Sequence, residues 1–172
     1  MKVGLIIVCS TLLLTSCVRH VDLRTDSSGI SPVSPAGYLL VTPEKVVSPE
    51  LAKTQEIVAQ RLSTKGYSAS ENGTLYLQVG TAIRPASLSL SKPGAVLAKA
   101  YKKRGSSKCV WNEYRVVIAL TAISDGLEVY RGSASEYHCK ESLTETLPIL
   151  IDSALAGLGN PRGAVTKRRR LN

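Results

Sequence analysis

The chain has 172 residues, with 22 Lys and Arg against 13 Asp and Glu, and a formal net charge of +9 at pH 7. This length fits one domain with short extensions, and it suffices to bury a core without help from disulfides. The sequence contains no Phe and one Trp, so we expect a core of Leu, Ile, Val, Ala and Tyr. After residue 16 no apolar stretch approaches the roughly 20 residues that a membrane-spanning helix requires.

The first 17 residues have the three parts of an export signal. Lys2 provides a positive charge, an apolar run of about 12 residues ends at Leu14, and Thr15 and Ser16 precede Cys17. The run predicts a signal peptide over residues 1–16, because it is too short to span a bilayer. Leu-Thr-Ser-Cys resembles the lipobox of bacterial lipoproteins, which implies that Cys17 becomes the lipidated first residue. The alternative is an ordinary signal peptide with an incidental cysteine.

The resemblance also implies a location. Several acyl chains on one cysteine give stable attachment, so the membrane is the first expected partner. Val18 follows Cys17, whereas the inner-membrane retention signal of lipoproteins usually has Asp at that place. We therefore expect a lipid-anchored protein of the outer membrane that faces the periplasm. Residues 17–35, rich in Ser and Pro, are interpreted as the lipidated cysteine and a flexible tether.

The next segments predict a strand and a helix. Residues 37–42 form a short β-type run that Pro43 ends. Ser48, followed by Pro and Glu, is typical of a helix start, and the apolar spacing predicts a helix over residues 48–65 that ends before Gly66.

Three further strands are predicted by alternating polarity. They cover residues 74–83, 110–123 and 127–136, and Ser-Asp-Gly at 124–126 predicts a hairpin turn between the last two. In that hairpin, the numbers of paired residues would add up to about 250.

A capping box at Ser142 and Glu145 precedes an apolar helical run to Leu158. Pro148 complicates this run, so the helix either bends there or begins later at Thr146. The element order is strand, helix, strand, strand, strand, helix. It predicts an α+β fold over residues 36–159, with a mostly antiparallel four-stranded sheet and both helices on one face. The first two strands are expected to be parallel neighbours, and residues 160–172 a basic tail.

Two cysteines remain besides Cys9 in the signal and Cys17. Cys109 and Cys139 lie near the open end of the predicted hairpin, and their numbers add up to 248, within reach of a pair that one bulge would align. In an oxidising compartment this spacing favours a disulfide. A metal site with His138 lacks a fourth ligand, and two free thiols are the remaining alternative.

Basic residues gather in two segments. No Asp or Glu occurs between Asn72 and Asn112, and the long connection over residues 86–108 is typical of a functional or disordered loop. A short helical turn is conceivable over residues 95–100. Export argues against nucleic acid, so the expected anions are lipid phosphates, lipopolysaccharide and peptidoglycan. The alternative is a solvated surface with a disordered tail. The anion-binding candidates are Lys99, Lys102, Lys103, Arg104, Lys108, Lys167, Arg168, Arg169 and Arg170.

The sequence provides no catalytic, cofactor or metal motif that we can recognise. His20 adjoins the anchor and His138 lies at a strand end, and no nucleophile elbow, phosphate-binding loop or paired metal-ligand spacing occurs. Glu113, Glu128 and Glu136 lie in predicted strands, where pairing with Arg115 or Arg131 is the simpler role. We therefore expect a protein that is not an enzyme, with no cofactor.

The lipobox, the tether and the element order together look like small Gram-negative envelope lipoproteins that carry one α+β domain of unknown function. Residues 51–67, which end in Leu-Ser-Thr-Lys-Gly-Tyr, resemble a passage common in such domains. The likeness implies an adaptor role in envelope assembly or cell-wall complexes, with an envelope protein, peptidoglycan or lipopolysaccharide as partner. Two hypotheses follow: a binding or scaffolding module, and a small-ligand carrier or hydrolase with an unrecognised site.

Overall fold

The computed structural model describes residues 20–30, 35–42, 48–98, 100, 110–139 and 141–171. The expected signal peptide, the expected lipidation site Cys17 and one member of the predicted disulfide, Cys109, lie outside these residues. So do five anion-binding candidates: Lys99, Lys102, Lys103, Arg104 and Lys108.

The described chain forms nine strands and two helices. In chain order they are β1 (His20–Gly29), β2 (Gly37–Leu40), α1 (Pro49–Ser63), β3 (Ser68–Ala69), β4 (Leu75–Pro85), β5 (Leu90–Lys92), β6 (Ala95–Ala98), β7 (Asn112–Ala122), β8 (Glu128–His138), α2 (Leu143–Ala154) and β9 (Val165–Arg170).

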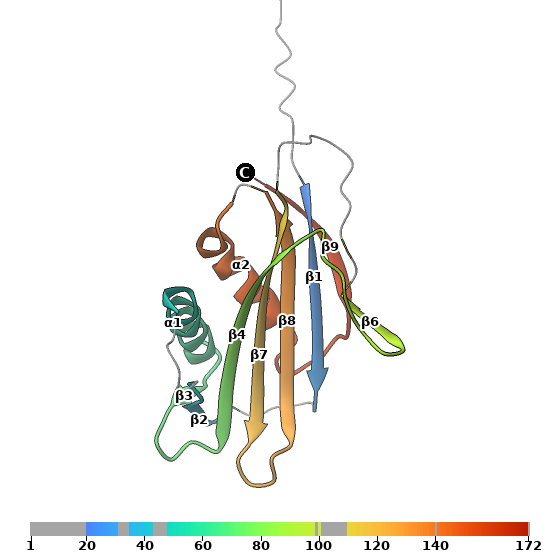
Figure 1. Ribbon diagram of the computed structural model, residues 1–172. Coiled ribbons are helices and arrows are strands. Elements are labelled where there is room, and N and C mark those ends of the chain that lie inside the picture. The colour runs from blue at the N-terminus through green and yellow to red at the C-terminus, as the bar shows by residue number, and fades with distance from the viewer. Residues whose placement is uncertain are drawn as a thin grey trace, which may run out of the picture.

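Seven strands form one mixed sheet in the order β3-β2-β4-β7-β8-β1-β9, and β5 and β6 form a separate pair (Figure 1). The α+β class holds, but the predicted sheet of four mostly antiparallel strands is wrong. Its four strands correspond to β2, β4, β7 and β8, at the middle and one side of the sheet. The strands that the sequence analysis missed include the two on the other side.

Those two strands are β1 and β9. Residues 20–29, expected in a flexible tether, pair with β8 on one side and with β9 on the other. Residues 165–170, expected in a basic tail, form the outer strand β9. Both strands are polar and carry few apolar residues, so their pairing depends on the neighbouring strand and leaves little local signal. Residues 95–98, where a helical turn was conceivable, form β6.

Two finer predictions are confirmed. β2 and β4 are parallel neighbours, with α1 in the connection between them. In the β7–β8 hairpin the paired residue numbers add up to 250 from Asn112 with His138 to Leu120 with Tyr130. The turn chemistry and the apolar alternation were therefore sufficient to fix this register.

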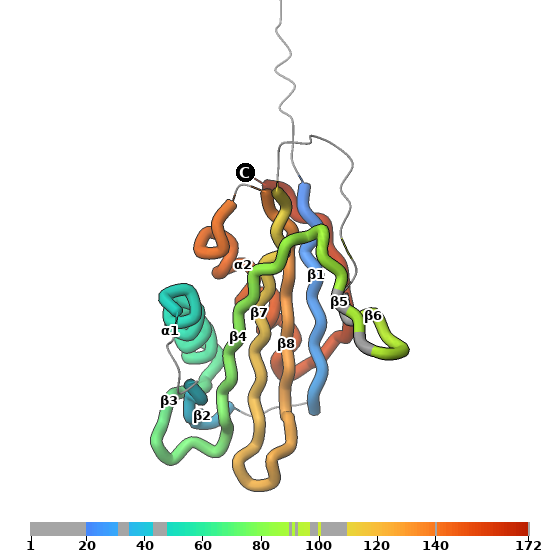
Figure 2. The backbone as a smooth tube through the Cα atoms, viewed as in Figure 1, coloured from blue at the N-terminus to red at the C-terminus, as the bar shows by residue number. Residues whose placement is uncertain are grey.

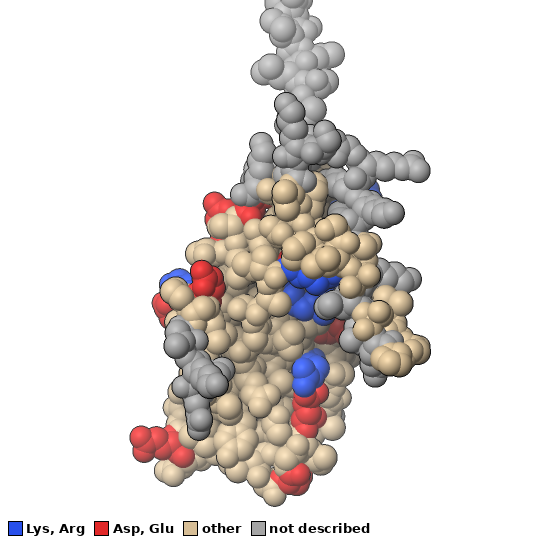
Figure 3. All heavy atoms as spheres, viewed as in Figure 1, with Lys and Arg blue, Asp and Glu red and all other residues tan. Residues whose placement is uncertain are grey.

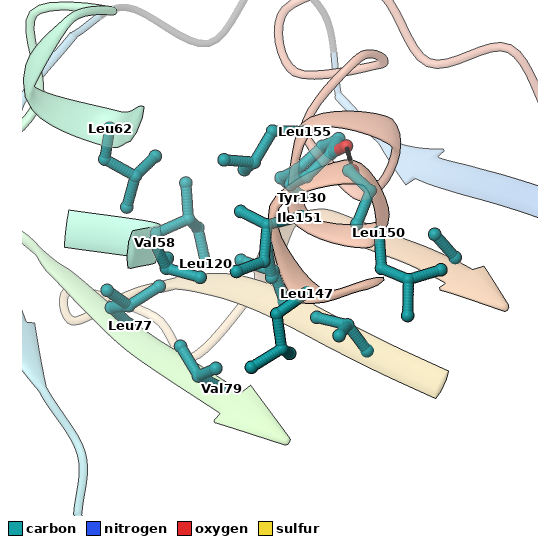
Figure 4. Packing of buried hydrophobic residues seen from close by; sticks show 14 of the residues in the cluster. Val58, Leu62, Leu77, Val79, Leu120, Tyr130, Leu147, Leu150, Ile151 and Leu155 are labelled. Atoms are coloured by element: carbon teal, nitrogen blue, oxygen red, sulfur yellow. Dashed lines mark hydrogen bonds between the residues drawn. The ribbon is translucent and has the colours of Figure 1, made fainter. Parts of the chain in front are cut away.

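Both helices pack on one face of the sheet and form the core with it (Figure 4). Ser48 caps α1 by accepting a hydrogen bond from the backbone N–H of Leu51. α2 begins at Leu143 with the complete capping box of Ser142 and Glu145, so Pro148 lies inside the helix rather than at its start. The side chains labelled in Figure 4 come from α1, β4, β7, β8, α2 and Leu155 directly after α2, and they point toward one another.

Tyr130 belongs to this core because the hairpin register pairs it with the buried Leu120. A register shift follows between Leu120 and Thr121, and both Val129 and Tyr130 are buried. The Tyr130 hydroxyl donates a hydrogen bond to the carbonyl of Ala154 at the end of α2. Gly132 lies beside this contact, and a Cβ there would collide with the same carbonyl. The close approach of α2 to β8 therefore requires glycine.

One end of the sheet, the upper end in Figure 1, collects several strand termini. β1 begins there, paired as His20 with Arg170 at the end of β9. β7 begins and β8 ends at the same level, as Asn112 with His138, and β4 ends opposite Asn112. Figure 2 follows the chain from β4 across this end to the β5–β6 hairpin. The lower end carries the β7–β8 turn.

Candidate functional site

Two polar clusters lie near the upper end, on opposite faces of β7 and β8. The first, the arginine cluster, lies on the face that the helices leave open and consists of Arg24, Arg84, Arg115, Glu113 and Tyr137. The second, the His138 cluster, lies on the helix-covered face.

The arginine cluster follows from strand register. Arg24 of β1 and Arg115 of β7 both pair with Ser135 of β8, one from each side, so their side chains flank it on the same face. One row nearer the upper end, Glu113 lies between Arg84 of β4 and Tyr137 of β8. The cluster thus spans four adjacent strands.

Glu113 holds two of the three arginines. Its side chain is 4% exposed, and it pairs with Arg84 and, at 3.1 Å, with Arg115. Burial raises the pKa of the Glu113 carboxyl, but the hydrogen bonds and charges of Arg84 and Arg115 outweigh this and lower the pKa below its ordinary value. Glu113 is therefore ionised at neutral pH. One carboxylate faces two guanidinium groups.

Arg24 adds a third positive charge. Its guanidinium carbon lies 5.2 Å from the centre of the Tyr137 ring, a cation–π geometry. No carboxylate among the described residues forms an ion pair with it, although Asp26 lies two residues along the same face. Arg24 is exposed, and 44% of the Arg115 side chain is exposed. The cluster therefore presents donors and net positive charge to solvent.

Figure 3 shows the open face of the sheet. Lys and Arg side chains gather over the upper half of the strands, and a lower basic group adjoins acidic side chains. Arg131 of β8 pairs with Glu128. The ordinary salt-bridge role predicted for Glu113 and Glu128 is thus confirmed, with Arg115 and Arg131 as the expected partners.

The His138 cluster is buried. His138 and Glu136 have fully buried side chains, with His138 Nε2 2.8 Å from Glu136 Oε2 and Nδ1 3.2 Å from Glu141 Oε2. The ring stacks on Tyr114, whose hydroxyl donates to the carbonyl of Glu141. Because carboxylates engage both ring nitrogens, His138 holds the end of β8 to the segment before α2.

Arg169 completes this cluster from β9. Its Nε and Nη2 donate to the two carboxylate oxygens of Glu136 at 2.8 and 2.6 Å. Burial by itself raises the pKa of Glu136, but the hydrogen bonds and charges of Arg169 and His138 bring it to about 2. Two parallel hydrogen bonds to one carboxylate fix geometry as well as charge. The pair therefore connects β9 to β8 across β1.

The predicted site residues fall into different roles. Arg169, a candidate anion binder, pairs with Glu136, and its anion binding stays a prediction. Lys167, Arg168 and Arg170 are exposed on β9. Their alternation along the strand places Arg168 and Arg170 on the open face and Lys167 with Arg169 on the other.

The cysteine pairing stays a prediction. Cys139 directly follows β8 and is half-buried, whereas Cys109 lies outside the described residues. The confirmed register supports the pairing. If the β7–β8 register continues by one residue beyond Asn112 and His138, Trp111 lies opposite Cys139. Cys109 is two residues before Trp111 in the chain.

No pattern in the sequence predicted the arginine cluster. Arg24 was hidden in the expected tether, and its partners Ser135 and Tyr137 lie more than 100 residues away in the chain. The alternation of Val21, Leu23 and Thr25 with polar residues is the signal that identifies β1. Only tertiary pairing shows which arginines it brings together.

One small hollow lies between β1, β9 and the end of α2. Its volume is about 160 Å³, below the roughly 300 Å³ at which ligand pockets typically begin. Leu23, Thr25, Ser27, Ser153, Gly157 and Val165 are among the residues that line it.

Within the described ranges no group of three or more His, Cys, Asp or Glu is placed to hold a metal ion. In that same part of the chain, no helix has the length and apolar character needed to cross a membrane.

Comparisons with known proteins give a fold likeness only. No family model matches the chain, and no curated protein matches its sequence. A PDZ domain protein from Parabacteroides distasonis has a similar structure, with a TM-score of 0.55 and 11% identity; the match covers 88% of this chain and 39% of that protein. The PelC dodecamer from Paraburkholderia phytofirmans and a variant of it give TM-scores of 0.46 and 0.47 at 13% identity, covering 84% of this chain and 100% of theirs. At such identities a likeness shows shared fold alone, and we draw nothing further from PelC.

Proposed function

We propose that this protein is a lipid-anchored binding module of the periplasm-facing outer membrane, which holds an anionic envelope component without catalysing a reaction. The lipobox that ends at Cys17 supports the anchor. The arginine cluster supports the anion, and it replaces the basic loop as the main candidate because its residues lie on rigid neighbouring strands.

The observation that carries this proposal is the pairing of Arg24 and Arg115 with the same residue, Ser135. Adjacent strands lie about 4.8 Å apart, so the two side chains start from backbone positions about 10 Å apart. Both reach one row toward the upper end, where Arg24 lies over the Tyr137 ring and Arg115 lies beside Glu113. A carboxylate or phosphate that enters between them receives charge-assisted hydrogen bonds from both sides. Peptidoglycan and lipopolysaccharide both offer such groups.

The test is binding of the purified protein to isolated peptidoglycan sacculi and to lipopolysaccharide. Arg24→Gln should weaken binding to the cognate material about tenfold, because a hydrogen bond to a charged group contributes roughly 1.5 to 3 kcal/mol. Free phosphate should compete if the ligand group is a phosphate, and free acetate if it is a carboxylate.

Arg131→Gln is the matched control, because it removes the same charge from the same face at a side chain that is 50% exposed and already paired with Glu128. If both variants lose the same binding affinity, the loss reflects net charge rather than the arginine cluster. If Arg24→Gln binds as tightly as the wild type, the arginine cluster is not the binding site.

The anchor has its own test. Labelled palmitate should enter the wild type and not Cys17→Ala, and the variant should leave the membrane fraction. Label in neither protein would make Cys17 an ordinary cysteine and would end the lipoprotein part of the proposal.

A further inference from the structure

The link between the expected anchor and the folded domain is short. β1 begins at His20, three residues after Cys17. Three residues extend by at most about 11 Å. The expected tether to residue 35 would have let the domain move freely above the membrane, but β1 is already the sixth strand in the sheet order. A lipid on Cys17 therefore places the upper end of the sheet next to the bilayer surface.

β9 ends at the same place and carries positive charge. Arg170 pairs with His20, and Arg168 pairs with Asp22 in the β1–β9 ladder. The Arg168 side chain is 75% exposed and lies 3.8 Å from Asp22, a loose contact in water. Arg170 is exposed, and no described carboxylate pairs with it.

The acidic groups near this end are already engaged. Glu136 is held by Arg169 and His138, and Glu141 contacts His138. Glu145 closes the capping box of α2. Asp22 is thus the one nearby described acid that competes for Arg168. The lower end differs, because Asp125 lies in its exposed turn and Glu128 starts the next strand.

We propose that the upper end of the sheet docks on the membrane that holds the lipid, with Arg168 and Arg170 against anionic phospholipid headgroups. This inference rests on the proposed lipidation of Cys17. A basic side chain is attracted to an anionic surface only within about one Debye length, roughly 8 to 10 Å. The short link brings Arg170 into that range, since it pairs with the first residue of β1.

The proposal fixes the orientation of the whole domain. β7 has 11 residues, so the β7–β8 turn stands about 35 Å from the docked end. Arg24 lies four residues below His20, which puts the arginine cluster about 13 Å from that end. The cluster therefore faces sideways along the membrane rather than outward into the periplasm.

The single Trp of the chain provides the test. Trp111 directly precedes β7 at the upper end. The full lipidated protein is placed in vesicles of phosphatidylcholine and phosphatidylglycerol that contain a headgroup-labelled dansyl lipid, and energy transfer from Trp111 is measured. In a second protein Trp111→Tyr is combined with Leu127→Trp, which moves the donor to an exposed position in the lower turn.

Transfer should be strong from Trp111 and weak from the lower position. In the Arg168→Gln, Arg170→Gln protein, the difference in energy transfer between the two donor positions should shrink on anionic vesicles. Salt near 1 M, where the Debye length is about 3 Å, should shrink the same difference in the protein with Arg168 and Arg170 intact. Arg131→Gln paired with Lys53→Gln removes two charges elsewhere and should change nothing.

Flotation of the vesicles separates the two proposals. If the protein floats but the two donors give equal transfer, the orientation is wrong and the anchor stands. If the arginine variant keeps the full difference, headgroup contact by Arg168 and Arg170 is wrong. If the protein does not float, the anchor fails and the docking fails with it.

Discussion

At the scale of single residues, one buried carboxylate organises the upper end. Glu136 accepts hydrogen bonds from Arg169 on β9 and contacts His138 on its own strand. Removing one member of such a buried set leaves the charge of the others without a partner. This lowers the free energy of unfolding by more than the intact set contributes in comparison with apolar residues at the same positions. Glu136 is therefore expected to be among the most sensitive polar positions in the domain.

Acid unfolding tests this. The folded pKa of Glu136, about 2, lies below its ordinary value of 4.5. The stabilisation is therefore fully present above about pH 4.5 and is lost as the pH falls toward 2. The difference corresponds to about 3 kcal/mol. The free energy of unfolding, measured with urea across this range, should fall less steeply in Glu136→Gln than in the wild type.

The exposed Glu128→Gln is the control, and it should keep the slope of the wild type. Parallel curves for wild type and Glu136→Gln would show that Glu136 does not have a depressed pKa in the folded state.

Residue-level prediction succeeded where partners are close in sequence. The pairs of Glu113 with Arg115 and of Glu128 with Arg131 join neighbours along one strand. It failed for Arg169 and Glu136, which are 33 residues apart, because nothing local indicates which strand lies beside another.

At the scale of elements, β9 is part of the fold rather than a disordered appendage. It pairs with β1 over six residues, and Arg169 secures it to β8. Edge strands rich in Lys and Arg resist pairing with further chains, because their charges repel a second copy. The basic composition that suggested a tail is thus compatible with an outer strand.

A truncation distinguishes strand from tail. Deleting residues 165–172 should lower the free energy of unfolding, because β1 loses one neighbour and Glu136 loses Arg169. Two point variants refine the comparison. Arg169→Gln should lower the free energy of unfolding by about 3 kcal/mol, in the range for a broken buried pair. Arg170→Gln should lower it by less than about 0.5 kcal/mol. Urea unfolding measures all three. A truncated protein as stable as the wild type would return residues 165–172 to the status of a dispensable tail.

Local patterns predicted the elements with strong signals. The caps at Ser48 and Ser142 and the turn at 124–126 lie where the structure has them. β3, which was not predicted, lies at the edge of the sheet and has two residues, and so short a strand carries little pattern of its own. β1 was missed for another reason, since its Ser and Asp residues are more typical of linkers.

At the scale of the whole molecule, the open end of the hairpin is also the end of the sheet at which β1 begins, where the proposed lipid anchor would attach. A disulfide between Cys109 and Cys139 would join β7 and β8 at this upper end, where β1 begins three residues after Cys17. The chain-entropy account gives about 3 to 4 kcal/mol for a closed loop of this length. This end of the sheet would then carry a covalent link between β7 and β8.

Thiol counting on exported protein decides this. Before reduction, neither Cys109 nor Cys139 in the mature chain should react with a thiol reagent. After reduction, both thiols should react. Reduction should lower the free energy of unfolding by about 3 kcal/mol, and the Cys109→Ser, Cys139→Ser protein should be insensitive to reductant. Two thiols that react without reductant would exclude the bond.

Local sequence patterns were sufficient for the α+β class, the central hairpin with its register, the parallel β2–β4 pair and the start of α1, and they left two possible starts for α2. Each depends on neighbours in the chain: turn residues, caps, and the periods of strand and helix. It also provided the lipobox, which remains the basis for the expected anchor.

Tertiary structure decided the rest, because strand pairing joins segments without regard to their distance in the chain. It placed β1 between β8 and β9, and so turned an expected tether and an expected tail into sheet. It gathered Arg24, Arg84 and Arg115 on one face, and it committed Arg169 to Glu136 while leaving Arg168 and Arg170 exposed. Backbone hydrogen bonds between strands are the same for every sequence, so only the packed fold shows which polar residues meet.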